Sequence, residues 1–296
     1  MKIKKSPSTI VFDLIKGILL LMMSLLCVLP FIIIISGSFT SNDVIIREGF
    51  SLLPRQFTME AYKTIFKNPA DILQAYKMNI YYTVVGTAVG LFIITLTAYV
   101  ISRKDFKYRN TVSFLIYFTT IFGGGMIPWY VMYANVLNLR GTPLAIWFPA
   151  LVTPFLVILM RTFIVGAIPD PVIESAKIDG AGHWRIFWQI VLPLLGPGLA
   201  TVGLFQALGY WNDWYRASMF SVDSSTWSLQ FYLYDLVNST QAMKQMAQYA
   251  SVNTADLPTQ SVKLAMAVVA TGPVLLLYPF VQRYFVSGIT VGAVKG

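Results

Sequence analysis

Six long, mostly apolar segments dominate the chain and restrict it to a bundle of membrane-spanning helices. A helix needs about 20 predominantly apolar residues to cross the hydrocarbon core of a bilayer. Segments of that length lie at residues 14–37, 79–101, 112–134, 144–165, 194–219 and 264–284. Only 12% of the 296 residues are charged, against about 25% in a soluble domain. We therefore expect an all-α integral membrane protein with six transmembrane helices.

The distribution of basic residues predicts the orientation of these helices. The first apolar segment follows Lys2, Lys4 and Lys5, and the second is followed by the short loop R-K-D-F-K-Y-R at 103–109. Short cytoplasmic loops carry an excess of Lys and Arg, so both termini and the loop after residue 165 are predicted to be cytoplasmic. The same bias accounts for the net charge of +9 without nucleic acid as a partner. The first segment lacks a small-residue cleavage site before Gly37, which favours a retained helix over a signal peptide.

A polar island between the fourth and fifth apolar segments reads D-P-V-I-E-S-A-K-I-D-G-A-G-H-W-R-I-F-W-Q-I-V-L-P-L-L-G-P, residues 170–197. Asp170 is predicted to cap a helix whose first residue is Pro171 and which ends near Ile178. Gly180 tolerates a positive φ and is expected to break the chain there. A second helix at 182–191 has Trp184, Phe187, Trp188 and Val191 at helical spacing. Pro193 and Pro197 are expected to open or bend the next span.

This island, with its E-S-A-x-x-D-G-A block followed by I-V-L-P, resembles the coupling loop of ABC importer permeases, the "EAA" motif. Further stretches resemble the carbohydrate-uptake, maltose-type permeases, and within them the lipo-oligosaccharide-type subgroup. They are N-I-Y-Y-T-V-V-G-T (79–87), A-Y-V-I-S-R (98–103), G-G-G-M-I-P (123–128), M-R-T-F-I (160–164), G-Y-W-N-D-W-Y (209–215) and Q-R-Y-F-V-S-G-I-T-V-G-A-V-K-G (282–296). Ser175 departs from the Ala that is usual in the motif. The resemblance implies a type I ABC importer permease bundle, with residues 1–296 as one transmembrane domain and 166–193 as its coupling loop.

The resemblance also implies which residues meet the ATPase. A force-transmitting loop needs small residues that enter a groove and a few charges that fix its register. The expected ATPase-coupling residues are Glu174, Ser175, Ala176, Lys177, Asp179, Gly180 and Ala181. The C-terminal tail is expected to enter between the ATPase subunits through Ser287, Gly288, Gly292, Lys295 and Gly296.

In this family the working unit contains two homologous permeases, two ABC ATPase subunits and an extracellular solute-binding lipoprotein. The chain has no G-x-x-x-x-G-K-[S/T] loop for a nucleotide phosphate. ATP and Mg are therefore expected in the partner ATPase, with no cofactor bound by this chain. The resemblance predicts a multi-pass protein of the bacterial cytoplasmic membrane, in contact with lipid and with its carbohydrate substrate.

Aromatic and polar residues near the end of the fifth apolar segment are candidates for the substrate path. Sugar sites combine aromatic faces with hydrogen-bonding groups, and the candidate residues are Trp211, Asn212, Asp213, Trp214 and Arg216. Asp213 and Arg216 are three residues apart and are expected to pair on one helical face. The alternative is an interfacial aromatic belt with a structural ion pair.

Glycines mark two further features. Gly123-Gly124-Gly125 predicts a broken helix within the third segment, where irregular backbone must be buried in protein or line a cavity. Gly86-x-x-x-Gly90 is a weak signal for close helix packing.

Two alternatives stay open beside the carbohydrate importer. One is a permease of the same ABC family for another class of solute, such as amino acids or polyamines. The other is a self-sufficient secondary transporter, which would be expected to show an internal repeat and ionisable residues at mid-membrane. A membrane enzyme is a third class, but the sequence offers no acid–base pair, nucleophile triad or metal cluster. The lone histidine, His183, is more typical of a surface residue than of a catalytic one.

Overall fold

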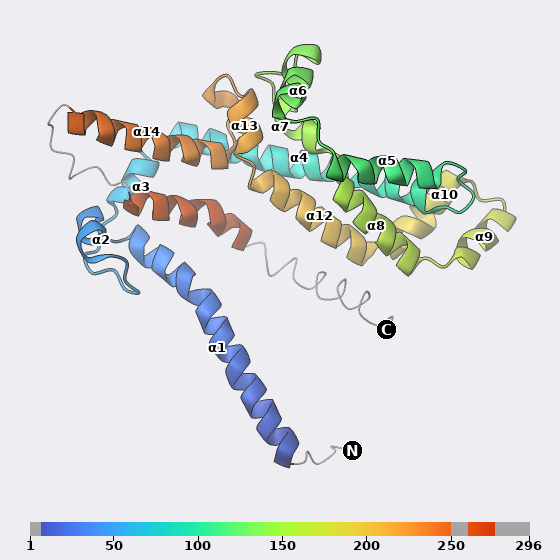
Figure 1. Cartoon of the computed structure of the whole chain (residues 1–296), viewed down its shortest axis with the longest axis horizontal. Helices are drawn as coiled ribbons and strands as arrows, with labels where there is room; N and C mark the ends of the chain where they lie inside the picture. Colours follow the sequence, from blue (N-terminus) through green and yellow to red (C-terminus); the bar gives the residue numbers. More distant parts are fainter. Residues whose placement is uncertain (1–6, 250–259, 276–296) are drawn as a thin grey trace. The chain divides into compact units, whose positions relative to one another are not determined.

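The structure is a computed structural model that describes residues 7–249 and 260–275, and within these residues it is helical (Figure 1). The chain divides into two compact units. Unit 1 comprises Met1–Asn68 and Asp235–Pro273, and unit 2 comprises Pro69–Tyr234 and Val274–Gly296. The single permease domain predicted for residues 1–296 stays a prediction, because this division concerns only contacts within the chain.

Unit 1 is built around one very long helix. Its elements are α1 (Pro7–Ser38), α2 (Asn42–Glu48), α3 (Glu60–Ile65), most of α14 (Leu229–Tyr249) and most of a helix at Gln260–Leu275. The hydroxyl groups of Ser38 and Tyr62 are 2.9 Å apart and tie the end of α1 to α3. The backbone N–H of Gln260 donates to Oδ1 of Asn42 over 2.9 Å. These polar contacts join segments that are distant in the sequence.

The apolar stretch Val11–Ser38 of α1 has 28 residues and a mean hydropathy of 3.1, which suits a membrane span. Leu14, Leu21 and Leu25 are each more than 60% exposed in the isolated chain. Large apolar side chains exposed along the helix are expected when lipid or another membrane subunit is the neighbour. The first predicted span, 14–37, therefore agrees with a helix that starts seven residues earlier.

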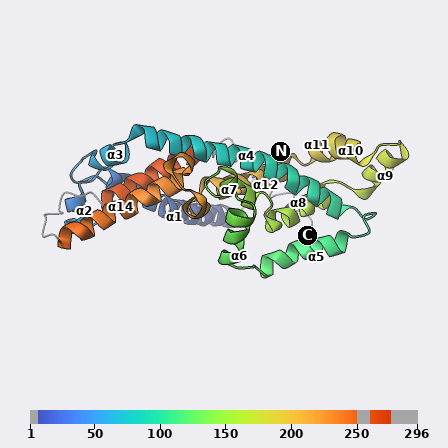
Figure 2. The same ribbon diagram turned by 90° about the horizontal axis from the view of Figure 1, so that it is seen from above.

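Unit 2 contains both the predicted coupling loop, 166–193, and the candidate path residues between 211 and 216. Its regular helices are α4 (Pro69–Ser102), α5 (Arg109–Ile121), α6 (Met126–Val131), α7 (Leu144–Trp147), α8 (Pro154–Ala167), α9 (Asp170–Ile178), α10 (His183–Ile186), α11 (Leu192–Leu194), α12 (Gly196–Trp211) and α13 (Tyr215–Phe220). Short π-helical turns occupy Met132–Val136 and Phe187–Val191, and 3-10 turns occupy Phe148–Ala150 and Ser224–Thr226. Helix α4 runs along this unit beside α8 and α12 (Figures 1 and 2).

Two glycines allow α4 to pack closely against α12. A Cβ at Gly86 would lie 2.4 Å from the ring of Tyr210, and one at Gly90 would lie 2.8 Å from Nε2 of Gln206, both in α12. Real Cβ atoms do not approach other atoms so closely, so both positions require glycine. The close packing predicted from Gly86-x-x-x-Gly90 is confirmed.

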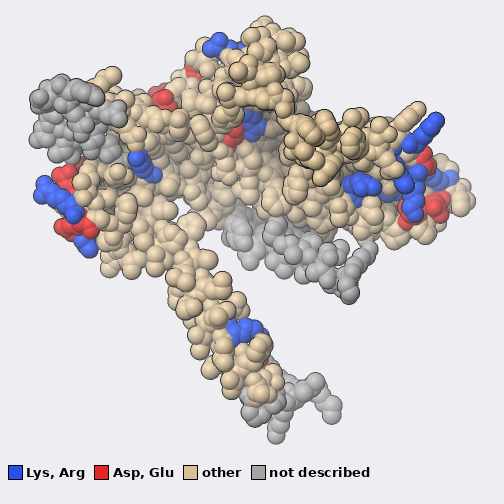
Figure 3. Space-filling view, in the orientation of Figure 1, with Lys and Arg blue, Asp and Glu red and all other residues tan. Residues whose placement is uncertain are grey.

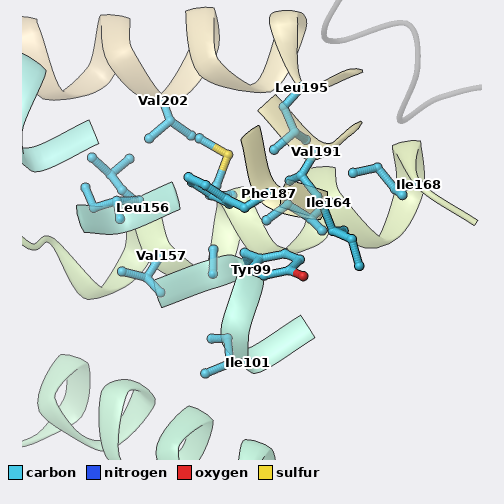
Figure 4. Close-up of a cluster of buried hydrophobic side chains, with 14 of the residues drawn as sticks. Tyr99, Ile101, Leu156, Val157, Ile164, Ile168, Phe187, Val191, Leu195 and Val202 are labelled. Atoms are coloured by element: carbon cyan, nitrogen blue, oxygen red, sulfur yellow. The ribbon is translucent and has the colours of Figure 1, made fainter. Parts of the chain in front are cut away.

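The main apolar core of unit 2 lies among α4, α8 and the segment from α9 to α12 (Figure 4). Ile94, Val157, Ile164, Ile186 and Val202 are fully buried there. Ile173 of α9 and the partly buried Ala176 and Ala181 also pack on this cluster. Part of the predicted coupling loop is thus attached to the bundle by burial of apolar surface.

Within residues 7–249 and 260–275, two helices, α1 and α4, are long and apolar enough to cross a membrane, and the total reaches five if each bent pair of helices forms one span. The six predicted spans and the cytoplasmic location of both termini therefore stay predictions. The last predicted span, 264–284, is described only to Leu275.

The third and fourth predicted spans, 112–134 and 144–165, are each broken. Helices α5 and the pair α6 with its π-helical turn meet at 114° (Figure 2), and the segments on either side of residues 151–153 meet at 47°. Gly123–Gly125 are non-helical and Gly125 has a φ of +87°, which confirms the predicted break. Pro154, which lacks a backbone N–H, follows the second break.

The fifth predicted span, 194–219, is not one helix. The segment His183–Leu194 meets α12 at 83° near Pro193 and Pro197, as the two prolines predict. Helix α12 ends at Trp211, and α13 begins only at Tyr215. The N–H of Asp213 donates to the carbonyl of Tyr210 over 3.2 Å. The chain therefore makes a turn between the two helices.

Candidate functional site

The predicted coupling segment forms a short helix that ends in a sharp turn. Helix α9 begins at Asp170 and ends at Ile178, as predicted within one residue. Pro169 occupies the position before the helix, and no side chain caps it. Asp170 is thus the first helical residue and not the cap, and Pro171 is the second residue. The carboxylate of Asp170 pairs with Lys104, as described below.

The turn after α9 confirms the expected role of Gly180. Its φ is +78°, and no atom lies within 4 Å of a Cβ built on it. The backbone conformation alone therefore favours glycine. Ile178, next to this turn, is 86% exposed, and Glu174, Ser175, Asp179 and Gly180 are exposed as well. Lys177, Ala176 and Ala181 are half-buried. Small and exposed residues thus form a protruding surface around an unpartnered isoleucine.

The second half of the segment only partly follows the predicted pattern. Residues 183–194 form α10, a π-helical turn and α11 in succession. Phe187 and Val191 are buried as predicted, whereas Trp184 and Trp188 are more than half exposed. Trp188 stacks on Phe92, with ring centroids 6.1 Å apart. The π-helical turn changes the angular spacing of the side chains, so the predicted apolar stripe does not stay on one face.

Charged side chains fasten α9 to the loop after α4. Lys104 Nζ lies 2.6 Å from Asp170 Oδ2, and Lys177 pairs with Asp105. The hydrogen bond from Lys177 lowers the pKa of Asp105, and the hydrogen bond from Lys104 lowers the pKa of Asp170. Basic and acidic side chains gather at the end of unit 2 that contains α9 and α10 (Figure 3). We call these four residues, Lys104, Asp105, Asp170 and Lys177, the charge brace.

His183 lies beside the charge brace. Its Nε2 is 4.0 Å from Asp105 Oδ2, and its Nδ1 is 3.3 Å from the hydroxyl of Tyr99. The guanidinium of Arg103 stands 5.3 Å from the centroid of the Tyr99 ring. These residues line a cavity of about 280 Å³. The side chain of His183 is more than half exposed, and both of its ring nitrogens have a polar neighbour.

A larger cavity lies among α6, α8 and α13. It has a volume of about 830 Å³ and is lined in part by Gly123–Gly125, Trp129, Tyr133, Thr153, Tyr215 and the Asp213–Arg216 pair. This volume falls within the range of about 300–1,000 Å³ typical of small-molecule sites. The helix break at the three glycines and the charged pair, which are far apart in the sequence, thus meet at one cavity.

The predicted pairing of Asp213 and Arg216 is confirmed. Arg216 Nε lies 3.1 Å from Asp213 Oδ2, and both side chains are about nine-tenths buried. The guanidinium of Arg216 also stands 5.1 Å from the centroid of the Tyr210 ring. A second cavity of about 300 Å³, lined by Tyr210, Gln206 and Arg216 among others, lies on this side of the pair. Arg216 therefore borders both cavities while its charge is neutralised.

The other candidate path residues lie elsewhere. Trp211 is buried, Asn212 is exposed, and the ring of Trp214 contacts that of Tyr234 in a tilted arrangement with centroids 4.7 Å apart. None of these three lines the 830 Å³ cavity. The role of all five path residues stays a prediction.

Sequence reasoning missed Trp129, Tyr133 and Thr153. Trp129 and Tyr215 are stacked with centroids 6.4 Å apart, and they form an aromatic wall of the cavity. Trp129 follows the glycine break by only four residues, a spacing that could have indicated its place at the cavity.

The predicted tail contacts fall in a part of the chain that the structure does not describe. The tail residues Ser287, Gly288, Gly292, Lys295 and Gly296 lie outside the described residues. Within the described part of the chain, no group of three or more His, Cys, Asp or Glu side chains is arranged to hold a metal ion.

The chain combines apolar helices of membrane-spanning length with a protruding turn and an aromatic cavity in unit 2. These are features of a membrane transport protein. No protein-family model matches the chain. It is 39% identical, over 96% of its length and 98% of the relative, to the polygalacturonan/rhamnogalacturonan transport system permease protein YtcP of Bacillus subtilis (strain 168). Protein LplC of the same organism is 37% identical over 97% of this chain and 95% of its own length.

A solved structure agrees with these relatives. One chain of a bacterial ABC transporter involved in the import of the acidic polysaccharide alginate matches with a TM-score of 0.77 and 29% identity. The match covers 95% of this chain and 99% of the other. The chain belongs to the family of carbohydrate-uptake ABC importer permeases, and it is a membrane protein.

Proposed function

We propose that the chain forms half of the translocation path of an ATP-driven oligosaccharide importer in a bacterial cytoplasmic membrane. The exposed turn at Ile178–Gly180, in the same unit as the 830 Å³ cavity, carries this proposal. A second, homologous permease would complete the path, and an extracellular solute-binding lipoprotein would deliver the substrate. The chain would cross the membrane six times, with both termini in the cytoplasm.

Two ABC ATPase subunits would bind the exposed surface of α9. Closure of the ATPase pair around ATP and Mg would push on Glu174, Ser175, Ala176, Asp179, Gly180 and Ala181. The protruding Ile178, absent from the predicted set, supplies an apolar anchor at the centre of this surface. The C-terminal tail is proposed as a further contact with the ATPases. Family membership argues against the alternative of a self-sufficient secondary transporter.

The 830 Å³ cavity is proposed to pass the sugar. Its stacked Trp129 and Tyr215 offer an aromatic face, while Thr153 and the Asp213–Arg216 pair offer hydrogen-bonding groups. Relatives named for polygalacturonan and alginate transport make uronic-acid oligosaccharides the first class to test. A permease of this family for a different solute class is the competing proposal.

Uptake of labelled oligogalacturonides by cells with and without this chain tests the substrate. We expect ATP-dependent uptake that requires the chain, and a loss of about two- to tenfold in Trp129→Ala, because an aromatic contact contributes about 0.5–1.5 kcal/mol beyond its buried area. Trp214→Ala removes an indole outside the cavity and should cost less. If cells without the chain take up oligogalacturonides as fast as cells with it, but lose uptake of another solute, the proposed substrate class is contradicted.

A further inference from the structure

The charge brace grips α9 at two points. Asp170 and Lys177 are seven residues apart, so they lie about 10 Å apart along the helix. Their partners, Lys104 and Asp105, are neighbours in the loop that follows α4. One loop thus binds both ends of α9. The helix supplies the acidic partner of one ion pair and the basic partner of the other. This pattern resists rotation of α9 relative to α4 in either direction.

Such a brace is needed because little else fixes the orientation of α9. A helix of nine residues is too short to be stable by itself in water. Ile173 is its one fully buried side chain. The apolar contacts of Ile173 and Ala176 attach one face of α9 to the core, whereas two ion pairs about 10 Å apart fix its angle. Exposed ion pairs contribute little to the free energy of unfolding, so the effect of the brace is on the orientation of α9.

Helix α4 connects this brace with the cavity. Near its other end, Nδ2 of Asn79 donates to the carbonyl of Trp211 over 3.4 Å. At its middle, Gly86 contacts the ring of Tyr210, which in turn lies under the guanidinium of Arg216. A displacement of α4 would therefore press on the wall that carries the Asp213–Arg216 pair.

We propose that Lys104 and Asp105 are positioning residues of coupling, which transmit the movement of α9 to α4 and thence to the cavity. Lys177 is assigned to this brace and not to the contact with the ATPase. The inference rests on the proposed function, and it adds the loop 103–108 to the coupling device. The ATPase pushes on the outer surface of α9. The brace keeps α9 from rotating about its contact at Ile173, so the movement is transmitted to α4.

The test uses the whole transporter, purified from membranes and reconstituted in lipid. Cys27→Ala removes the chain's own cysteine, and Met132→Cys places a reporter in the 830 Å³ cavity. The maleimide labelling rate of this cysteine is measured without nucleotide and with ATP plus vanadate. The variants are Asp105→Lys, Lys177→Asp and the double variant that exchanges the two charges.

We expect ATP plus vanadate to change the labelling rate by about fivefold or more in the parent. Each single reversal should abolish most of that change while the ATPase still co-purifies and hydrolyses ATP. The double exchange should restore it. The matched control reverses an exposed ion pair of unit 1, Arg55→Glu against Glu48, whose atoms are 2.6 Å apart. This control should keep the full ATP-driven change.

Three results would overturn the inference. Single reversals that keep the full change would show that the brace is not needed. Single reversals after which the ATPase no longer co-purifies would place Lys177 or Asp105 in the docking contact with the ATPase. A parent complex that contains the ATPase but shows no ATP-driven change would refute the proposed function, and the inference with it, before any brace variant is made.

Discussion

At the scale of single residues, Gly180 and Gly182 form a natural comparison. Neither has an atom within 4 Å of a built Cβ, but Gly180 has a φ of +78° and Gly182 a φ of −72°. Gly180→Ala should cost about 1–2 kcal/mol, because an L side chain is disfavoured at positive φ. Hydrogen exchange of the amides in residues 170–186 should accelerate by about 5–30-fold. Gly182→Ala should leave this exchange nearly unchanged, and equal acceleration in both would contradict the argument from backbone conformation.

Gly86 supplies a second prediction at this scale. Gly86→Ala would place a Cβ 2.4 Å from the ring of Tyr210, and overpacking of this kind costs about 1–3 kcal/mol. A lower midpoint of thermal unfolding in detergent is the expected result. Gly166→Ala is the matched control in α8, where a Cβ meets nothing within 4 Å. That variant should be neutral or more stable, since alanine favours helix by about 0.5–1 kcal/mol over glycine.

At the scale of elements, the charge brace should weaken in acid. Lys177 lowers the pKa of Asp105 and Lys104 lowers the pKa of Asp170. His183 also faces Asp105, with its Nε2 4.0 Å from Oδ2. A carboxylate with a lowered pKa in the folded chain stabilises it above the unfolded pKa of about 3.9. That stability is lost as the pH falls through the lowered value. Protection of the α9 amides should therefore decrease as the pH falls below about 4.

The double variant Asp105→Asn with Asp170→Asn is the control for this effect. It cannot titrate at these two positions, so its α9 amides should show weaker protection at neutral pH and a flatter response to acid. Equal pH dependence in the variant and the parent would assign the effect to other carboxylates.

The sequence predicted the ends and breaks of helices where local signals were strong. It failed where tertiary contacts determine the bends and the pairing of charges. The length of α9, the positive φ of Gly180 and the break at Gly123–Gly125 follow from backbone preferences that act within a few residues. The interruption at residues 151–153 and the end of α12 at Trp211 were missed, because apolar content identifies a span but not the bends within it. The charge brace was also missed, since Lys104 and Asp170 are too far apart in sequence for any local pattern to join them.

At the scale of the whole molecule, the family was predictable because its motifs cover nearly the full chain, and the relatives confirm it. The candidate site was predictable only in part. The Asp213–Arg216 pair follows from a spacing of three residues, whereas Trp129 and Thr153 reach the same cavity only through the packing of α6 and α8. Membership of a cavity depends on tertiary geometry, which a residue pattern within one span does not contain.

Docking of an ATPase on the exposed surface of α9 fixes the subunit composition of the native complex, which can be measured. The chain would be purified from its own membranes through an internal tag, as wild type and as Ile178→Glu, and the accompanying proteins quantified. We predict that wild type brings one equivalent of a second permease and two of an ABC ATPase, and that Ile178→Glu keeps the permease but loses the ATPase. A stable assembly of this chain alone, with no ATPase in the wild-type preparation, would contradict the account.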